Sequence, residues 1–516
     1  MSSATATKPA ATTDAEATNG GSGGSPPSPR QVLCPPDGIN PALEAMEYAV
    51  RGPLVLKAGR YAAALKEAAA GGKPANLPFD SVVLCNIGNP QSVGQAPMTY
   101  LRQVLATIAC PWLLAQPNIR AELPADVVAR AEAFLSSTHG LGAYSESKGL
   151  PSVRASVAAY ITARDGGEPA DSDAVFLTNG ASDSVKNILE MLVRGPTDGV
   201  MVPMPQYPLY SAALTKMGAR RVSYGLLEDD GWGVGVDDLE AAYAAAVADG
   251  TTVRALVVIN PGNPTGQVLS QAVMEGLVRF CERHTLVLMA DEVYQVNVYA
   301  EGKTFTSFKK VVRSLGSPVE LVSFHSTSKG MIGECGLRGG YMEVVNFHPH
   351  AMDVLYKAAS VSLCSNIPGQ VAMDVMVKPP VEGEPSYALY KQEMDSTYDA
   401  LRRKAAKLAS VLNTLPGISC NPSEGSMYLF PRVVLPPAAV AAAADAGMKP
   451  DGLYANELLD ATGVCVVPGS GFGQAPGTFH IRTTFLPTED AMEQMVNRMR
   501  DFHLGFMKKY GGETTA

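Results

Sequence analysis

Five short apolar runs, each ending in small or polar residues, constrain the fold of this chain more than any other feature of its sequence. They are residues 174–180, 199–205, 254–261, 285–292 and 320–326, and the segments between them have helical patterns, such as residues 271–284. Buried strands that alternate with helices are typical of a largely parallel sheet with helices on both faces. We therefore predict an α/β fold, in which ligands bind beyond the carboxyl ends of the strands.

The sequence outside this core predicts a tail and a smaller second domain. Residues 1–36 are mostly Ala, Ser, Thr, Gly and Pro, and they cannot bury enough surface to offset the entropy of ordering. The last part of the chain is predicted to be α+β, because a long polar helix precedes three strand-like runs, over 391–412, 426–433, 464–469 and 479–485. The predicted organisation is a disordered tail over 1–36, an N-terminal arm and part of the smaller domain over 37–100, the large domain over 101–360 and the smaller domain over 361–516.

Charge and composition narrow the classes of partner. The formal net charge of -9 argues against a nucleic acid or an anionic membrane surface as the partner. No apolar run approaches the roughly 18 residues of a membrane helix. The eight cysteines and seven histidines show no spacing typical of metal ligands. We expect small-molecule partners, no nucleic acid, no membrane span and no metal.

The cellular location depends on the first 36 residues. Scattered cysteines without a disulfide pattern favour a reducing compartment, and we predict the cytoplasm. The alternative is a mitochondrial transit peptide within the tail, although the tail carries Asp14 and Glu16 beside Lys8 and Arg30 and lacks a basic amphipathic pattern.

The end of the first strand, at residues 179–183, predicts an anion site. A helix begins there, so the backbone N–H groups of Gly180, Ala181 and Ser182 and the positive end of the helix face the edge of the sheet. A phosphate group would be held in such a place. The alternative is a simple turn with Ser182 or Asp183 as the helix N-cap.

Three further strand ends present aromatic and polar side chains. Tyr207 follows the second strand and either lies against a flat ligand or packs in the core. The third strand leads to a turn rich in proline and glycine that presents Asn263, and the fourth ends at Asp291, with Tyr294 three residues later. Because Asp291 follows an apolar strand, its carboxylate needs a partner. A buried cationic ring nitrogen is one candidate, and a loop that the carboxylate caps is the other.

The fifth strand leads to the segment HSTSKGMIGECGLRGG at residues 325–340. Small residues flank Lys329, so a planar ligand can approach it closely, and a desolvated lysine near other cations loses its proton readily enough to act as a nucleophile. We expect Lys329 to form a Schiff base. Ser326 and Arg338 supply a hydroxyl and a bidentate cation suited to a phosphate. The alternative for Arg338 is a surface salt bridge.

Four motifs together carry a family resemblance. They are NPGNPTG at 260–266, DEVYQ at 291–295, STSKG at 326–330 and FHIRTTF at 479–485. Their combination, from about residue 38 to the C-terminus, resembles the class I aminotransferases that use pyridoxal 5′-phosphate, which have fold type I. The resemblance implies that this cofactor binds covalently to Lys329 and that its ring nitrogen pairs with Asp291. It also implies that Asn263 and Tyr294 hydrogen-bond the phenolic oxygen of the ring.

The same resemblance implies the remaining site residues and a second subunit. Tyr207 would stack on the ring, and Arg482 with Asn263 would bind the α-carboxylate of the substrate. Tyr144 resembles a tyrosine that reaches the phosphate from the partner subunit, so a homodimer is implied. The phosphate ligands within one chain would be Gly180, Ala181, Ser182, Ser326 and Arg338.

Shorter segments indicate a branch of the family. YAVRGP, GECGLRGGY and VVPGSGFGQ resemble the alanine aminotransferases, which implies transfer of the amino group from L-alanine to 2-oxoglutarate, giving pyruvate and L-glutamate in a ping-pong cycle. Enzymes that use glyoxylate as the acceptor share much of this pattern, so the acceptor stays open between the two. A β-lyase and a non-catalytic ligand sensor of the same fold are further alternatives. No residue for the second carboxylate of glutamate can be named from the sequence.

Overall fold

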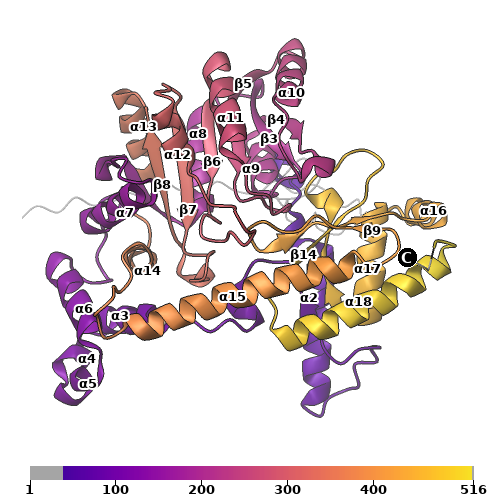
Figure 1. The fold of residues 1–516 in the computed structure, drawn as a ribbon, viewed down its shortest axis with the longest axis horizontal. Coiled ribbons are helices and arrows are strands. Elements are labelled where there is room, and N and C mark those ends of the chain that lie inside the picture. Colours follow the sequence, from indigo (N-terminus) through magenta and orange to yellow (C-terminus); the bar gives the residue numbers. More distant parts are fainter. Residues whose placement is uncertain (1–38, 514–516) are drawn as a thin grey trace, which may run out of the picture.

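The computed structural model of the protein describes residues 39–513, so the predicted disordered tail lies outside the described part. Its centre is a seven-stranded sheet with the strand order β2-β8-β7-β6-β5-β3-β4 (Figure 1). Apart from the pairs that β8 makes, neighbouring strands run parallel, as predicted. The strands are β2 (Val175–Asn179), β3 (Asp198–Met204), β4 (Arg220–Gly225), β5 (Thr252–Ile259), β6 (Val287–Asp291), β7 (Leu321–Ser326) and β8 (Gly339–Val345).

β8 runs antiparallel to both of its neighbours, β2 and β7. Its first residue, Gly339, pairs with Asn179 at the end of β2, and its second residue pairs with Ser326 at the end of β7. The chain therefore leaves the sheet at the end of β7, makes one loop and re-enters the sheet as β8 at the same end of the strands. That loop carries Lys329 and Arg338, so both are held where the parallel strands end.

Helices cover both faces of the sheet because successive strand residues point to opposite faces. Along β5, Leu256 and Val258 join one buried apolar cluster, and Val257 and Ile259 join another. Helices α10, α11 and α12 complete the first cluster, and α8, α9 and α13 complete the second. Their bounds are α8 (Ala181–Leu192), α9 (Leu209–Met217), α10 (Val236–Ala248), α11 (Gln271–His284), α12 (Phe308–Ser314) and α13 (Pro349–Ser360).

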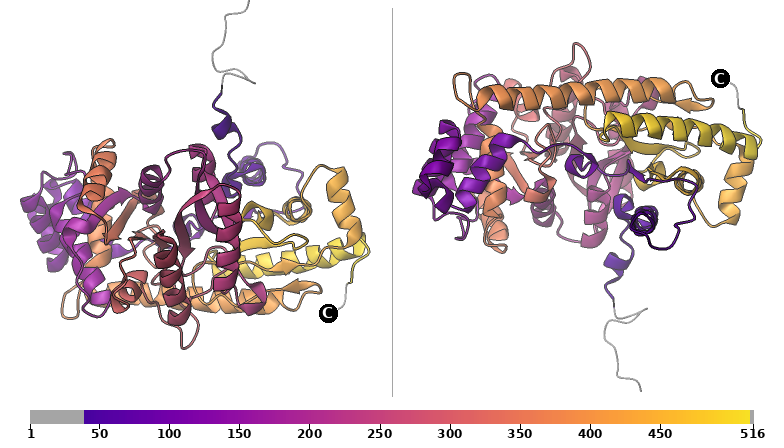
Figure 2. Two further views of the ribbon diagram at one scale, coloured as in Figure 1. Left: turned by 90° about the horizontal axis from the view of Figure 1, so that it is seen from above. Right: turned by 90° about the horizontal axis from the view of Figure 1, so that it is seen from below.

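Two further groups of elements flank this sheet on opposite sides (Figure 2). One group is helical and lies beyond β2 and β8, against which α7 and α14 pack. It consists of α3 (Thr99–Ala109), α4 (Trp112–Ala115), α5 (Pro117–Glu122), α6 (Ala125–Ser137), α7 (Pro151–Arg164) and α14 (Ile367–Val377).

The other group joins the two ends of the described chain. β1 (Val83–Leu84) pairs in parallel with β12 (Val464–Cys465), and the long helix α15 (Tyr387–Leu412) passes beneath the sheet beside α18 (Glu489–Lys509) (Figure 1). A three-stranded sheet in the order β10-β14-β13 and the pair β11-β9 complete it. The remaining elements are α1 (Pro41–Glu44), α2 (Pro53–Ala69), β9 (Ile418–Ser419), β10 (Tyr428–Leu429), β11 (Arg432–Val433), α16 (Pro437–Asp445), α17 (Pro450–Thr462), β13 (Val467–Pro468) and β14 (Ile481–Thr484).

The five predicted strands are confirmed, and the predicted helix over 271–284 is α11. Two strands of the seven-stranded sheet, β4 and β8, were not predicted from the sequence. β4 is an edge strand that exposes alternate residues. β8 begins with two glycines and contains Glu343, whose charge is hidden in the structure by an ion pair of 2.9 Å with the equally buried Lys309.

The C-terminal segments differ from prediction in detail. The strand expected over 426–433 is two strands, β10 and β11, because Pro431 between them has no N–H group to donate. The strand over 464–469 is likewise split into β12 and β13. α15 begins at Tyr387, one turn before the predicted start, since buried Tyr390 extends its apolar face.

Within residues 39–513, every helix is too short or too polar to cross a lipid bilayer. The proposed boundaries between the domains stay a prediction.

Candidate active site

A cavity of about 410 Å³ opens at the edge where the parallel strands end. Its walls come from the ends of β5, β6 and β7, from the start of α8, and from N-terminal and C-terminal segments that fold over this edge. Ten of the predicted site residues line it: Ala181, Ser182, Tyr207, Asn263, Asp291, Tyr294, Ser326, Lys329, Arg338 and Arg482. Residues as far apart in the sequence as Tyr48 and Arg482 are thereby brought to one place.

The Lys329 side chain is directed by a backbone carbonyl from the N-terminal part of the chain. Its Nζ donates a hydrogen bond of 2.9 Å to the carbonyl oxygen of Gly88 and lies 5.7 Å from the centre of the Tyr294 ring. A Cβ atom on Gly88 would collide with the hydroxyl of Tyr428 and would lie 2.8 Å from Nζ. Glycine at this position therefore provides the space in which the amine lies.

Asp291 is a buried carboxylate with one satisfied oxygen. Tyr210 donates a hydrogen bond of 2.9 Å to Oδ2, whereas Oδ1 has no hydrogen-bond partner within residues 39–513. Burial raises the pKa of Asp291 to about 6, although the Tyr210 hydroxyl, the Val293 backbone N–H and the charge of Lys329 oppose this shift. Asp291 lines the cavity, so its unpartnered oxygen is available as an acceptor for a buried cationic donor.

The start of α8 and Arg338 form a pocket for an anion. Arg338 donates to the carbonyl oxygen of Asn179 at 3.0 Å, to Ser182 Oγ at 3.4 Å and to Ser328 Oγ at 3.3 Å. Gly180 precedes the helix with φ of 80°, and a Cβ atom there would collide with the Arg338 guanidinium. The guanidinium, serine hydroxyls and first N–H groups of α8 thus converge, and this set of donors suits a phosphate.

Arg482, from β14, is the second anion-binding group. It is only 1% exposed, and its guanidinium lies between the rings of Tyr428 and Phe472, at 4.1 and 4.6 Å from their centres. It donates to Asn263 Oδ1 at 3.1 Å and to the carbonyl oxygen of Asn86. No carboxylate within the described part of the chain pairs with it, and its Nε has no acceptor there. A buried cation without a counter-ion is costly, so this geometry calls for an anionic ligand.

A chain of tyrosines closes the cavity around these groups. The hydroxyls of Tyr207 and Tyr48 lie 2.8 Å apart, and Tyr294 donates to the Tyr428 hydroxyl at 3.4 Å. Burial raises the pKa of Tyr428, but the charges of Lys329 and Arg482 outweigh it, so the pKa lies below its usual value. The Tyr428 phenol therefore gives up its proton more readily than a phenol in water.

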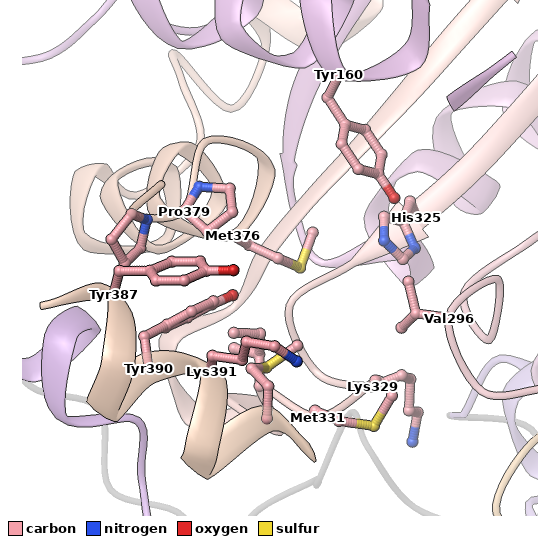
Figure 3. A pocket seen from close by; sticks show the side chains of 14 residues that line it. Tyr160, Val296, His325, Lys329, Met331, Met376, Pro379, Tyr387, Tyr390 and Lys391 are labelled. Carbon is pink, nitrogen blue, oxygen red and sulfur yellow. The ribbon is translucent and has the colours of Figure 1, made fainter. Parts of the chain in front are cut away.

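A second cavity, of about 430 Å³, lies between the loop after Lys329 and the start of α15, and its lining is more apolar than that of the first. Figure 3 shows aromatic and methionine side chains around it, with the Lys329 amine pointing away from them. Burial and the charge of Arg164 hold the pKa of His325, which lines this cavity, at about 3, so its ring is neutral. The walls of this cavity are mostly apolar and include no arginine, and Lys391, which also lines it, already forms an ion pair with Asp395.

Two predicted residues do not line the first cavity. Gly180 lies just behind Arg338, as described above. Tyr144 is 78% exposed and lies in the loop between α6 and α7. The next residue, Ser145, accepts a hydrogen bond of 3.0 Å from Gln370 of α14. Its predicted contact with the phosphate of a second subunit is not tested by a single chain and stays a prediction.

Residues that shape the site but were not predicted from the sequence include Tyr48, Gly88, Tyr210 and Tyr428. For Tyr210 a signal was available, because it stands three residues after Tyr207, in the first turn of α9. The other three come from segments that the sequence gives no reason to place beside the sheet.

The fold and this set of side chains define a class of enzyme. The sequence profile of the family described as "Aminotransferase class I and II" matches residues 115–499, and the chain belongs to this family. A solved structure of an aminotransferase from Escherichia coli has the same fold, with a TM-score of 0.70 and 23% identity over 91% of this chain and 99% of that one. The predicted fold class and family are thereby confirmed.

The curated relatives point to a particular branch. The chain is 49% identical to a "Probable alanine aminotransferase, mitochondrial" of Dictyostelium discoideum, covering 92% of this chain and 89% of the relative. It is 46% identical to "Glutamate--glyoxylate aminotransferase 1" of Arabidopsis thaliana, covering 92% of this chain and 96% of the relative. The predicted resemblance to alanine aminotransferases is confirmed, and the second relative matches the alternative acceptor considered above.

Proposed function

We propose that the protein is a pyridoxal-phosphate-dependent alanine aminotransferase, which transfers the amino group of L-alanine to 2-oxoglutarate and yields pyruvate and L-glutamate. The observation that carries the proposal is the buried Arg482 guanidinium, which has no acidic partner and faces the same cavity as the Lys329 amine. An amino acid bound through its α-carboxylate at Arg482 would direct its amino group and Cα towards Lys329.

The residues present fit pyridoxal phosphate. The orphaned Oδ1 of Asp291 would accept a hydrogen bond from the protonated ring nitrogen, and Lys329 would hold the aldehyde carbon. The phosphate would take the donors of Ser182, Ser326 and Arg338. When bound, the cofactor would supply an electron sink for the bond at Cα and carry the amino group between the two substrates.

The side chains of the cavity then have distinct tasks in the proposed reaction. Arg482 binds and orients the α-carboxylate, and the planes of Tyr428 and Phe472 keep its guanidinium in one orientation. The Lys329 amine would act as the base that removes the proton from Cα and as the acid that delivers it to a carbon of the cofactor. The carbonyl oxygen of Gly88 restricts the position of this amine. Asp291 stays anionic beside a cation and so preserves the positive charge of the ring nitrogen.

A homodimer is part of this proposal. Tyr144 and two further apolar residues that precede α14, Val361 and Leu363, are 78%, 85% and 52% exposed. A hydrogen bond from Gln370 of α14 to Ser145 joins α14 to the loop that carries Tyr144. Asn366, the N-cap of α14, donates a hydrogen bond to the carbonyl oxygen of Arg338. These exposed side chains thus lie beside the anion pocket, and a second copy that covers them would bring its own Tyr144 to the other pocket.

The experiment is a steady-state assay of pyruvate formation from L-alanine, with pyridoxal phosphate bound and with either 2-oxoglutarate or glyoxylate as acceptor. We expect turnover with 2-oxoglutarate that Lys329→Ala abolishes. A strong preference for glyoxylate would favour the second candidate, a glutamate/alanine:glyoxylate aminotransferase, for which the Arabidopsis relative is the supporting observation. No pyruvate with either acceptor would refute both. The location, cytoplasm or mitochondrion, stays a prediction because it depends on the first 36 residues.

A further inference from the structure

The proposed reaction sets a requirement that Arg482 alone does not meet. One site must accept the methyl group of L-alanine and, in the second half of the cycle, the side-chain carboxylate of L-glutamate. A fixed, buried cation for that carboxylate would face the methyl group without a counter-ion and would be costly. The group that binds the second carboxylate should therefore reach the cavity and also be able to return to water.

The cavity is lined by four cations, and three of them have partners. Lys329 donates to Gly88, Arg338 is held by Ser328 and the carbonyl oxygen of Asn179, and Arg482 is stacked and hydrogen-bonded. The fourth is Arg51, an exposed residue that also lines the cavity. Within residues 39–513 its side chain makes no hydrogen bond and no ion pair.

The backbone at Arg51 is fixed although its side chain is free. It ends a single 3-10 turn, η1 (Ala49–Arg51), directly before α2. The Tyr48 hydroxyl contacts that of Tyr207 at 2.8 Å, and Val50 is 3% exposed in a cluster that includes Phe472. Phe472 is the ring on which Arg482 stacks, so Arg51 and Arg482 approach the cavity from neighbouring elements.

We propose that Arg51 binds the side-chain carboxylate of L-glutamate and 2-oxoglutarate, and that its guanidinium lies in solvent when L-alanine or pyruvate is bound. This inference rests on the proposed function, since it assigns a residue to one of the two substrates of that reaction. Because Arg51 is exposed, its withdrawal leaves no unpaired charge in the cavity, whereas the 1% exposed Arg482 keeps the α-carboxylate common to both substrates.

Arg51→Gln and Arg51→Lys test the proposal in the protein with bound cofactor, with each half-reaction followed by stopped-flow absorbance of the cofactor. A hydrogen bond to a charged group is worth about 1.5–3 kcal/mol, so kcat/KM for L-glutamate and 2-oxoglutarate should fall about 10- to 150-fold in Arg51→Gln, mainly through KM. Arg51→Lys should recover part of this loss. The matched control is Arg60→Gln, which removes the same charge from an exposed position of α2 outside the cavity.

The comparison with L-alanine decides the outcome. The proposal expects kcat/KM for L-alanine to change less than about threefold in Arg51→Gln. An equal fall for L-alanine and L-glutamate would instead show a structural role for η1, and no fall for either would show that Arg51 does not touch the substrate. Both results overturn the assignment.

A binding measurement separates this assignment from the proposed reaction. Glutarate carries both carboxylates of 2-oxoglutarate but cannot react, and pentanoate has the same chain length with one carboxylate. By calorimetry, the wild-type protein should bind glutarate more tightly than pentanoate, and Arg51→Gln should abolish the difference. An unchanged preference for glutarate in the variant overturns the role of Arg51, whatever the overall reaction is. Absence of alanine turnover in the wild-type protein refutes the proposed function instead.

Discussion

Replacing Arg482 by methionine should separate catalysis from folding. The guanidinium is 1% exposed and has no carboxylate partner in the described residues, so the substrate carboxylate would be its counter-ion. Removing one partner of a buried, hydrogen-bonded ion pair costs about 3–5 kcal/mol, which corresponds to about a 100- to 5,000-fold fall in kcat/KM for L-alanine.

The stability of the same variant should change little. Arg482→Met loses hydrogen bonds to Asn263 and Asn86, at about 1 kcal/mol each, but it also removes an unpaired buried charge. Methionine retains apolar contact with Tyr428 and Phe472. We therefore expect a thermal midpoint within about 5 °C of the wild-type value.

The assay measures kcat/KM for L-alanine and thermal unfolding on the same preparations. Arg402→Met is the control, because its exposed side chain lies on α15 away from the cavity. A variant of Arg482 that keeps kcat/KM within tenfold of wild type would refute the assignment of the α-carboxylate site. A variant that unfolds would show that Arg482 is needed for the fold, contrary to the stability argument.

Three further predictions concern the other groups of the site. The folded-state pKa of Asp291 is about 6, above its ordinary value of 3.8, so ionisation of Asp291 destabilises the protein without cofactor as the pH rises from about 4 to 6. Without cofactor, Asp291→Asn should therefore be as stable as wild type near pH 4 and more stable above pH 6, by up to about 3 kcal/mol. With pyridoxal phosphate bound, the same variant should be inactive. Equal stability of the two proteins at pH 8 would contradict this. Gly88→Ala should lower kcat at least about 100-fold, because the added Cβ displaces the Lys329 amine. The control is Gly59→Ala in α2, where a Cβ meets nothing within 4 Å and kcat should be unchanged. Full activity of Gly88→Ala would refute the role of Gly88. Mixing inactive Lys329→Ala chains with Tyr144→Ala chains should restore activity if Tyr144 serves the partner's site, because each mixed dimer then holds one intact site, and no recovery after confirmed subunit exchange would contradict this.

Much of the sheet could be predicted because its strands are buried on both faces and appear as unbroken apolar runs. The edge strand β4 gave a weaker signal, and β8 was hidden by Glu343, whose charge is neutralised only in the folded state by Lys309 from α12. A buried ion pair between segments far apart in sequence has no local signature.

The candidate site follows the same pattern. Asp291, Lys329 and Asn263 could be identified because each stands where a strand ends, and strand ends of a parallel sheet meet at one edge. Gly88 and Tyr428 could not, because they reach the cavity only through the packing of the N-terminal and C-terminal segments over that edge. Their positions depend on long-range contacts rather than on local pattern.

Mixing the protein, loaded with pyridoxal phosphate, with excess L-alanine and no keto acid tests the proposed function most directly. Quantification of pyruvate after rapid quenching should give about one molecule per bound cofactor and then no more, and addition of 2-oxoglutarate should restart release together with L-glutamate. Continued release of pyruvate without any acceptor would indicate a lyase. The absence of a first equivalent of pyruvate would contradict the proposed use of L-alanine as amino donor.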